Sequence, residues 1–265
     1  MDQKIIKQTI LQVGAESGEY LRNHFYTFKN VFRKDIGSIV TNVDLELTEI
    51  IIRRLKTIFP NHGIIIHGGE SINESASCRW LVDPLDGSSH FSRNIPIYTV
   101  NIAFQEDGQT IFGAVNHPQT HQLFFAQKGG GAYLNGIDIK VSTQAELAKA
   151  FIFVELPEYK FSHQKDAAAN FSQNMAIANQ LIQQAGQVES FRIGAFGQCL
   201  VAAGSFDAYV DLSGSSQEVG QAASTLIVEE AGGQVVNITK PENGFVQLLV
   251  TNSHLDQALK SLVLS

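Results

Sequence analysis

Cysteine is scarce in this sequence, and its scarcity excludes one class of protein. Only two cysteines, Cys78 and Cys199, occur among 265 residues. Two cysteines cannot build the disulfide framework that stabilises small secreted proteins. The cysteine content is typical of a reducing compartment, and we expect a cytoplasmic protein.

Net positive charge and long apolar runs are missing as well. The formal net charge is −7, and no cluster of Lys and Arg marks a nucleic-acid surface. No apolar run is long enough to cross a bilayer. The first residues begin an amphipathic pattern without the apolar core of a signal peptide. We therefore expect no nucleic acid, membrane or secretion signal.

What the sequence does have is apolar material for a large core. Its residues are 44% hydrophobic and 17% charged, as in ordinary globular proteins. A chain of this length suits one large domain or two closely joined subdomains. We expect one compact unit made of an N-terminal subdomain (1–145) and a C-terminal subdomain (146–265).

Apolar spacing predicts a layered α/β protein. Residues 2–26 and 43–59 have helical spacing, and 64–66 is a short buried strand. An antiparallel meander then follows, with strands at 98–105, 110–116, 122–127 and 132–134. The second half alternates strands and helices. Its expected strands are 150–155, 188–193, 207–212, 234–238 and 247–251, and its expected helices are 165–185, 195–204, 220–231 and 254–262.

The most informative segment is 80–91, where a strand leads into an acidic turn. Asp83 and Asp86 lie three residues apart, and Pro84 stiffens the chain between them. Two carboxylates aimed at one point suit a hard cation such as Mg²⁺. A plain surface turn is the competing interpretation, because Asp-Pro and Asp-Gly pairs are common in turns.

The same segment ends in small residues that suit an anion. Gly87, Ser88 and Ser89 offer backbone amides, and a helix that begins there would point its positive end at a phosphate. Ser88 as an ordinary helix cap is the alternative. Carboxylates beside such a helix start are the parts needed to handle a phosphate ester.

Five segments together resemble the motifs of the inositol monophosphatase family, and the resemblance covers almost the whole chain. They are Val40–Asp44 (V-T-x-x-D), Gly68–Ser71 (G-E-E-S in the family), Asp83–Phe91 (D-P-[IL]-D-G-[ST]-[ST]-x-F), Lys128–Gly136, and Ala222–Gly233 (A-A-x-x-L-I-V-x-E-A-G-G). The resemblance implies an αβαβα sandwich of the inositol monophosphatase and fructose-1,6-bisphosphatase type. It also implies Mg²⁺-dependent, lithium-sensitive hydrolysis of a phosphomonoester.

The resemblance also implies a role for each matching residue. Asp83 would bridge two Mg²⁺ ions, with the carbonyl of Leu85 on the first and Asp86 on the second. The amides of Gly87, Ser88 and Ser89 would bind the phosphate. Asp44 and Ser88 would orient the attacking water, and Asp211 would contact substrate hydroxyls. A homodimer is implied as well.

Two positions depart from the family. Its first Glu in G-E-E-S and its Asp before x-A-A are metal ligands, and here these positions are Gly69 and Gly220. We therefore expect weakened metal binding and low activity. Glu70 could turn inward and replace the missing ligand of the first metal, or it could lie next to the metal ligands without contacting the ion. Glu218 could compensate at the second metal, although a solvated loop acid is the simpler interpretation.

Other chemically suggestive residues have plainer explanations. Four histidines could suggest a transition-metal site, but their spacing is not that of a zinc site, so structural or hydrogen-bonding roles are favoured. They are His67, His90, His117 and His121. Segment 129–131 lacks the Lys-Ser/Thr of a phosphate loop and predicts a strand connection. Cys199 lies on an apolar helix face and is expected in the core.

Three functions remain open from the sequence. The first is hydrolysis of an inositol monophosphate-like ester at a weakened metal site. The second is a catalytically impaired relative that binds or regulates. The third is a phosphatase for another ester, such as a nucleotide 3′-phosphate or a sugar bisphosphate. Segment 156–170 is expected to help shape the substrate pocket.

Overall fold

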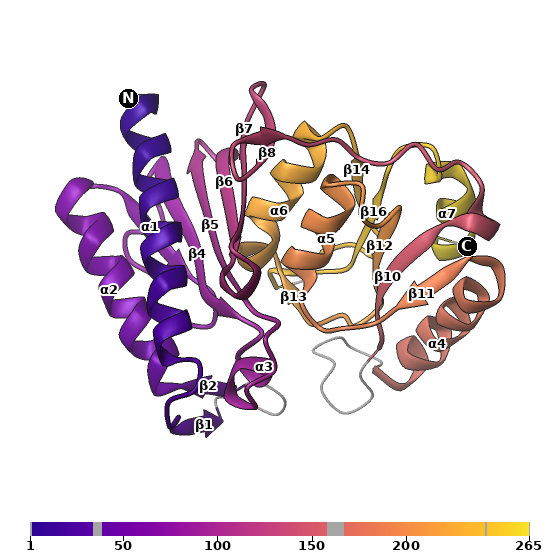
Figure 1. Cartoon of the computed structure of the whole chain (residues 1–265), viewed down its shortest axis with the longest axis horizontal. Coiled ribbons are helices and arrows are strands. Elements are labelled where there is room, and N and C mark those ends of the chain that lie inside the picture. Colours follow the sequence, from indigo (N-terminus) through magenta and orange to yellow (C-terminus); the bar gives the residue numbers. More distant parts are fainter. Residues whose placement is uncertain (1, 34–38, 158–166, 242, 265) are drawn as a thin grey trace.

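The computed structural model describes residues 2–33, 39–157, 167–241 and 243–264 (Figure 1). Its α-helices are α1 (Gln3–His24), α2 (Asn42–Ile58), α3 (Ser88–Ser92), α4 (Ala167–Gln184), α5 (Gly194–Ala202), α6 (Glu218–Glu230) and α7 (Asp256–Val263). Two short 3₁₀ helices, Pro118–Thr120 and Leu147–Lys149, join neighbouring elements. None of the helices in these ranges is both long and apolar enough to cross a membrane.

Most strands belong to two sheets. The larger sheet has the order β3-β4-β5-β6-β7-β8-β9, from Gly63–Ile66, Cys78–Asp86, Thr99–Glu106, Gln109–His117, Gln122–Gln127, Gly131–Leu134 and Ile137–Asp138. The smaller has the order β11-β10-β12-β16-β14, from Gln187–Glu189, Phe151–Glu155, Ala208–Asp211, Leu248–Thr251 and Gln234–Asn237. The other described strands form two antiparallel pairs, β1 with β2 (Val31–Arg33, Ile39–Thr41) and β13 with β15 (Ser216–Gln217, Phe245–Val246).

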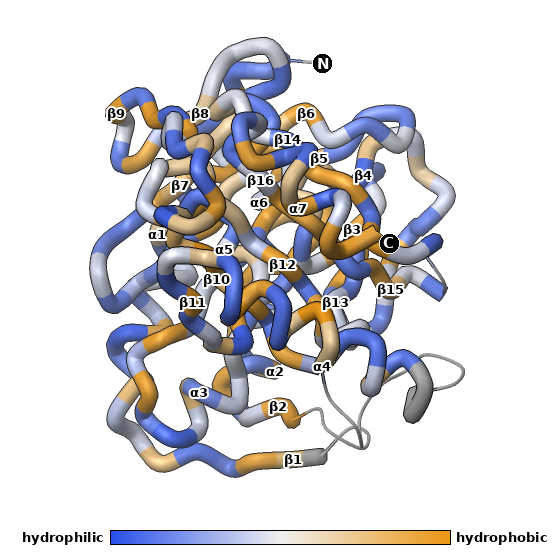
Figure 2. The backbone as a smooth tube through the Cα atoms, turned by 90° about the vertical axis from the view of Figure 1, so that its right-hand side faces the viewer, coloured by the Kyte–Doolittle hydropathy of each residue, from blue (hydrophilic) through white to orange (hydrophobic). Residues whose placement is uncertain are grey.

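The elements form five layers, which confirms the predicted αβαβα sandwich. Helices α1 and α2 cover the outer face of the larger sheet, and α5 and α6 fill the space between the two sheets (Figure 1). Helices α4 and α7 cover the other face of the smaller sheet. Figure 2 shows hydrophobic segments along the central strands and hydrophilic ones in many connecting loops. Each sheet therefore buries both faces.

The predicted helices form because their apolar residues fall on one side. In α1 the buried residues Ile6, Ile10 and Val13 recur every three or four positions and enter the core against the larger sheet. Helix α2 begins with a capping box in which Thr41 and Asp44 satisfy each other's backbone amides. This cap fixes Asp44 at the start of the helix.

Several element boundaries differ from the sequence prediction. Strand β4 continues through Pro84 to Asp86, where a turn was expected. Strand β11 is only Gln187–Glu189, because the chain then turns toward α5. The short strands β1, β2, β9, β13 and β15 were not predicted, since two or three residues carry no readable periodicity.

Two strand ends bring the sheets' polar residues together. Strands β10 and β12 pair in parallel, so their carboxyl ends meet at one edge with Glu155 opposite Asp211. In α/β sheets, ligands bind outside the carboxyl ends of parallel strands. This edge lies beside α5, whose backbone reaches the end of β4.

Candidate active site

Strand β4 delivers both carboxylates of the predicted acidic segment. Its pairing with β5 shifts register between Asp83 and Asp86, so Pro84 lies where the ladder is already irregular. Asp83 is buried, and its Oδ1 accepts a hydrogen bond from the Leu85 amide at 3.3 Å. The carboxylates are therefore held by a distorted strand end rather than by a free turn.

The predicted helix start after Asp86 is confirmed, although α3 is only five residues long. Gly87 precedes it with φ 87°, a left-handed conformation that glycine adopts without steric cost. A Cβ at Gly87 would also lie 2.9 Å from the Ile97 carbonyl oxygen. The amides of Ser88 and Ser89 fall in the first turn of α3, where no intrahelical acceptor exists.

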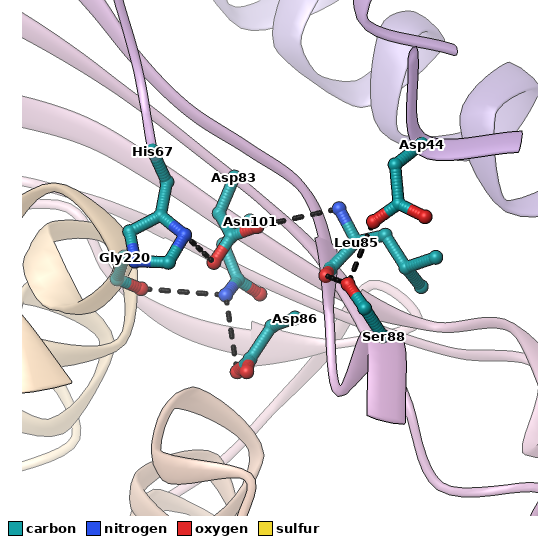
Figure 3. Close-up of polar contacts among 8 residues, drawn as sticks. All are labelled: Asp44, His67, Asp83, Leu85, Asp86, Ser88, Asn101 and Gly220. Atoms are coloured by element: carbon teal, nitrogen blue, oxygen red, sulfur yellow. Dashed lines mark hydrogen bonds and ion pairs between the residues drawn. The ribbon is translucent and has the colours of Figure 1, made fainter. Parts of the chain in front are cut away.

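The structure brings Asp44 and Ser88 together from distant parts of the chain (Figure 3). Ser88 Oγ lies 2.6 Å from Asp44 Oδ1 and 2.9 Å from the Leu85 carbonyl oxygen. The other Asp44 oxygen accepts hydrogen bonds from the amide and hydroxyl of Thr41. Burial raises the pKa of Asp44, and the hydrogen bonds from Ser88 and Thr41 oppose that rise.

Asp86 lies in surroundings that disfavour its negative charge. Burial, followed by the Asp83 carboxylate, raises the pKa of Asp86 to about 7. Asn101 Nδ2 lies 3.5 Å from Asp86 Oδ2 and 3.3 Å from the Gly220 carbonyl oxygen. Asn101 Oδ1 is buried without a hydrogen-bond partner among the described residues. Asp83 and Asp86 are neighbouring carboxylates shielded from water, and such a pair favours a bound cation.

Asp211 lies at the end of β12 and is fully buried. Its Oδ1 accepts hydrogen bonds from the amide and hydroxyl of Ser213 at 2.8 and 2.6 Å. Glu155 of β10 lies beside it, and burial, then the Asp211 carboxylate, raises the pKa of Glu155 well above its usual range. Within the described part of the chain, Glu155 Oε1 and Asp211 Oδ2 are buried without partners.

Sequence reasoning missed Asn101 and Glu155, and it favoured a structural or hydrogen-bonding role for His67 without naming a partner. His67 Nδ1 lies 3.3 Å from Asp83 Oδ2. A readable signal existed for the first two, because each is a polar residue in an otherwise apolar strand, T-V-N-I-A-F and F-I-F-V-E. For His67 the sequence held no signal, since its partner Asp83 is sixteen positions away.

The two glycine positions differ in their surroundings. A Cβ at Gly220 would lie 3.3 Å from Asp83 Oδ2, so a side chain there would face the carboxylates. A Cβ at Gly69 would lie 2.8 Å from Ile66 Cγ2. Glu70 has an exposed side chain. Glu218 lines a cavity of ≈ 470 Å³ whose described lining includes neither Asp83 nor Asp86.

The described residues fit a weak cation site better than a pair of closed ones. Asp83 and Asp86 supply desolvated carboxylates, which favour a cation. Over the described ranges, however, no three His, Cys, Asp or Glu side chains converge as a metal site. Mg²⁺ can bind with so few protein ligands, because it keeps several waters and needs only one or two carboxylates.

Part of the expected substrate pocket lies outside the described residues. The structure covers Leu156, Pro157 and the chain from 167 onward, so 158–166 of the predicted segment 156–170 is not described.

A layered α/β fold with a helix start beside paired carboxylates fits one class of protein, the phosphoric monoester hydrolases. The chain belongs to the inositol monophosphatase family, whose model matches residues 2–264. The family resemblance and the enzyme class expected from the sequence are thereby confirmed. Members of this family are generally metal-dependent.

Individual relatives are similar to this chain over most of its length, and a solved structure shares its fold. Inositol monophosphatase 2 of Solanum lycopersicum is 30% identical over 259 residues, with 94% of each chain covered. Nus factor SuhB of Pasteurella multocida is 32% identical over 231 residues, covering 87% of this chain and 81% of that one. The structure of extragenic suppressor protein suhB from Bartonella henselae superposes with a TM-score of 0.87 at 24% identity, with 98% of each chain covered.

Proposed function

We propose that the protein hydrolyses a small phosphate monoester, most like an inositol monophosphate, with Mg²⁺ held at a weakened site. The observation that carries this proposal is the hydrogen bond of 2.6 Å between Ser88 and Asp44 at the start of α3. A hydroxyl and a carboxylate so joined can orient a water toward a phosphate bound at the helix start. The name of the Solanum lycopersicum relative, inositol monophosphatase 2, supports the inositol ester.

Three sets of groups in this chain would hold the substrate and the metal ion in the proposed reaction. The amides of Gly87, Ser88 and Ser89 bind phosphate oxygens, and Asp211 contacts a substrate hydroxyl. Asp83, Asp86 and the Leu85 carbonyl would hold Mg²⁺, which supplies positive charge against the phosphate when bound. Glu70 is exposed, and it would become a further metal ligand only by turning inward.

The proposed step is attack by one water molecule. Asp44 and Ser88 hold the water and accept its proton as the water oxygen bonds to phosphorus. The bond between phosphorus and the ester oxygen breaks, and the leaving alkoxide takes a proton to become the free alcohol. Inorganic phosphate is the second product.

A catalytically impaired relative that binds or regulates is the alternative with an observation in its favour. Gly69 and Gly220 offer no side chain where the family pattern has two acids. Hydrolysis of a nucleotide 3′-phosphate or a sugar bisphosphate is a further alternative, which a substrate panel separates from the first.

The test is phosphate release from inositol 1-phosphate over a Mg²⁺ titration, with the wild type and Asp44→Asn. We expect the wild type to release phosphate at high Mg²⁺ and Asp44→Asn to be about 10²- to 10⁴-fold slower. Asp138→Asn is the matched control, because Asp138 is an exposed acid on β9. Equal rates for the wild type and Asp44→Asn, or silence over the whole ester panel, would reject the proposed chemistry.

We also propose a cytoplasmic homodimer. Support for the compartment comes from two free cysteines, of which Cys199 is buried in the core as expected. Support for the dimer comes only from the family resemblance. Light scattering on the purified protein tests it, and a monomeric mass at micromolar concentration would count against it.

A further inference from the structure

His67 lies beside the carboxylates, directly before the segment Gly68–Ser71. Its backbone amide donates a hydrogen bond of 2.8 Å to the Val82 carbonyl, which fixes His67 next to β4. Its Nδ1 lies 3.3 Å from Asp83 Oδ2, and its side chain is 36% exposed. Figure 3 shows the imidazole between Gly220 and Asp83.

The absence of a side chain at Gly220 makes room for this arrangement. Outside its own helix, a Cβ at Gly220 would come within 4 Å of two atoms of the described residues, Asp83 Oδ2 at 3.3 Å and His67 Cδ2 at 3.8 Å. The imidazole therefore borders the space that an Asp side chain at position 220 would enter. The acid that the family pattern has at position 220 and the imidazole of His67 would therefore lie next to the same space beside Asp83.

The distance between the two side chains suits a shared metal ion. Two nitrogen or oxygen ligands at about 2.0–2.2 Å from one ion lie about 2.8–3.6 Å apart for angles between octahedral and tetrahedral. His67 Nδ1 and Asp83 Oδ2 are 3.3 Å apart. Water and a substrate phosphate would fill the remaining positions, as in open catalytic sites.

We propose that His67 replaces the carboxylate missing at position 220 and, with Asp83, holds a single divalent transition-metal ion such as Mn²⁺, Co²⁺ or Zn²⁺ in preference to Mg²⁺. Imidazole suits these ions, whereas Mg²⁺ prefers oxygen ligands only. Binding replaces any proton on Nδ1 by the metal, and that proton leaves to solvent. Two protein ligands agree with the lack of a converged group of three in the described residues.

This inference rests on the proposed phosphatase site and adds the identity of its metal ion. It is tested by metal binding alone. The probe is Co²⁺, titrated into the full chain and followed by visible absorption and calorimetry, with Mg²⁺ titrated separately. We expect Co²⁺ to bind at least about tenfold more tightly than Mg²⁺. His67→Ala should weaken Co²⁺ binding at least about tenfold, because loss of even a ligand's partner costs 10- to 100-fold.

Two further variants keep the result interpretable. His254→Ala removes an exposed histidine before α7 and should leave Co²⁺ affinity unchanged. The double variant His67→Ala, Gly220→Asp exchanges an imidazole for a carboxylate and should bind Mg²⁺ more tightly than His67→Ala does. Circular dichroism confirms that each variant is folded.

The proposal is overturned if the wild type binds no Co²⁺, or if His67→Ala binds it as tightly as the wild type. It is also overturned if His254→Ala loses as much affinity, since binding would then be unspecific. Each of these results leaves hydrolysis with Mg²⁺ as a separate question, because no ester is present in the titration.

Discussion

At the scale of single residues, the hydroxyl of Ser88 is the group that joins the phosphate turn to Asp44. The motif that Asp83–Phe91 resembles allows Ser or Thr at position 88, and the two side chains share the hydroxyl. Ser88→Thr should therefore keep most of the activity, whereas Ser88→Ala should lower kcat about 10²-fold or more. Steady-state phosphate release measures both. Equal loss in the two variants would mean that the space around Ser88 matters, and not its hydroxyl.

A second residue-scale prediction concerns His117 and stability. The ring is 3% exposed and stacks on Phe196 with centroids 4.2 Å apart. Burial lowers the pKa of His117 to about 4. Below pH 6.5 His117 binds a proton in the unfolded chain but stays neutral in the folded protein. The free energy of unfolding therefore falls between about pH 6.5 and 4.

The measurement is urea unfolding at pH 7.5 and pH 5. From this residue the wild type should lose about 2 kcal/mol over that interval. His117→Phe keeps an aromatic ring against Phe196 and should lose correspondingly less. If both proteins lose stability equally, His117 is not the group that titrates.

At the scale of elements, helix α1 packs unusually close to strand β6. A Cβ at Gly18 would lie 2.2 Å from Asn116 Nδ2, which itself donates a hydrogen bond of 2.8 Å to the Gly14 carbonyl. A Cβ at Gly14 would meet only Leu123 Cδ1, at 3.7 Å. These two glycines form a matched pair within one helix.

Gly18→Ala should destabilise the protein by about 1–3 kcal/mol, since Asn116 must move and lose its bond to α1. Gly14→Ala should be neutral or stabilise by up to about 1 kcal/mol through helix propensity. Thermal unfolding of the two variants measures the difference. Equal melting temperatures would show that α1 can shift away from β6 without cost.

The sequence predicts long elements well and short ones poorly. Periodicity identified α1, α2 and the meander because many buried positions repeat along each of them. It failed at β4, where Asp83 and Pro84 interrupt the apolar run after Val82 while the strand continues to Asp86. The pairing with β5 decides where β4 ends, and that pairing is not visible in the local pattern.

At the scale of the whole molecule, the site forms where α2, α3, β4 and α6 meet. Motifs in the sequence named Asp44, Asp83, Asp86 and Ser88, and the fold joins the elements that carry them. Sequence could not show that His67 borders the space beside Gly220, because that contact depends on how β3 and α6 approach β4. The division into 1–145 and 146–265 stays a prediction.

The central claim is that a phosphatase site survives here with weakened Mg²⁺ binding, because Gly220 replaces an acid beside Asp83. A Cβ at position 220 would lie 3.3 Å from Asp83 Oδ2, so an Asp there can turn toward the same ion after a small adjustment. Gly220→Asp tests this position alone, without the close contact to Ile66 that Gly69→Glu would bring.

The most direct measurement is the Mg²⁺ dependence of phosphate release from inositol 1-phosphate by the wild type and Gly220→Asp. We predict that Gly220→Asp lowers the half-saturating Mg²⁺ concentration at least about tenfold, a change of the size that partners of metal ligands produce. An unchanged Mg²⁺ dependence in a folded, active variant would contradict the account.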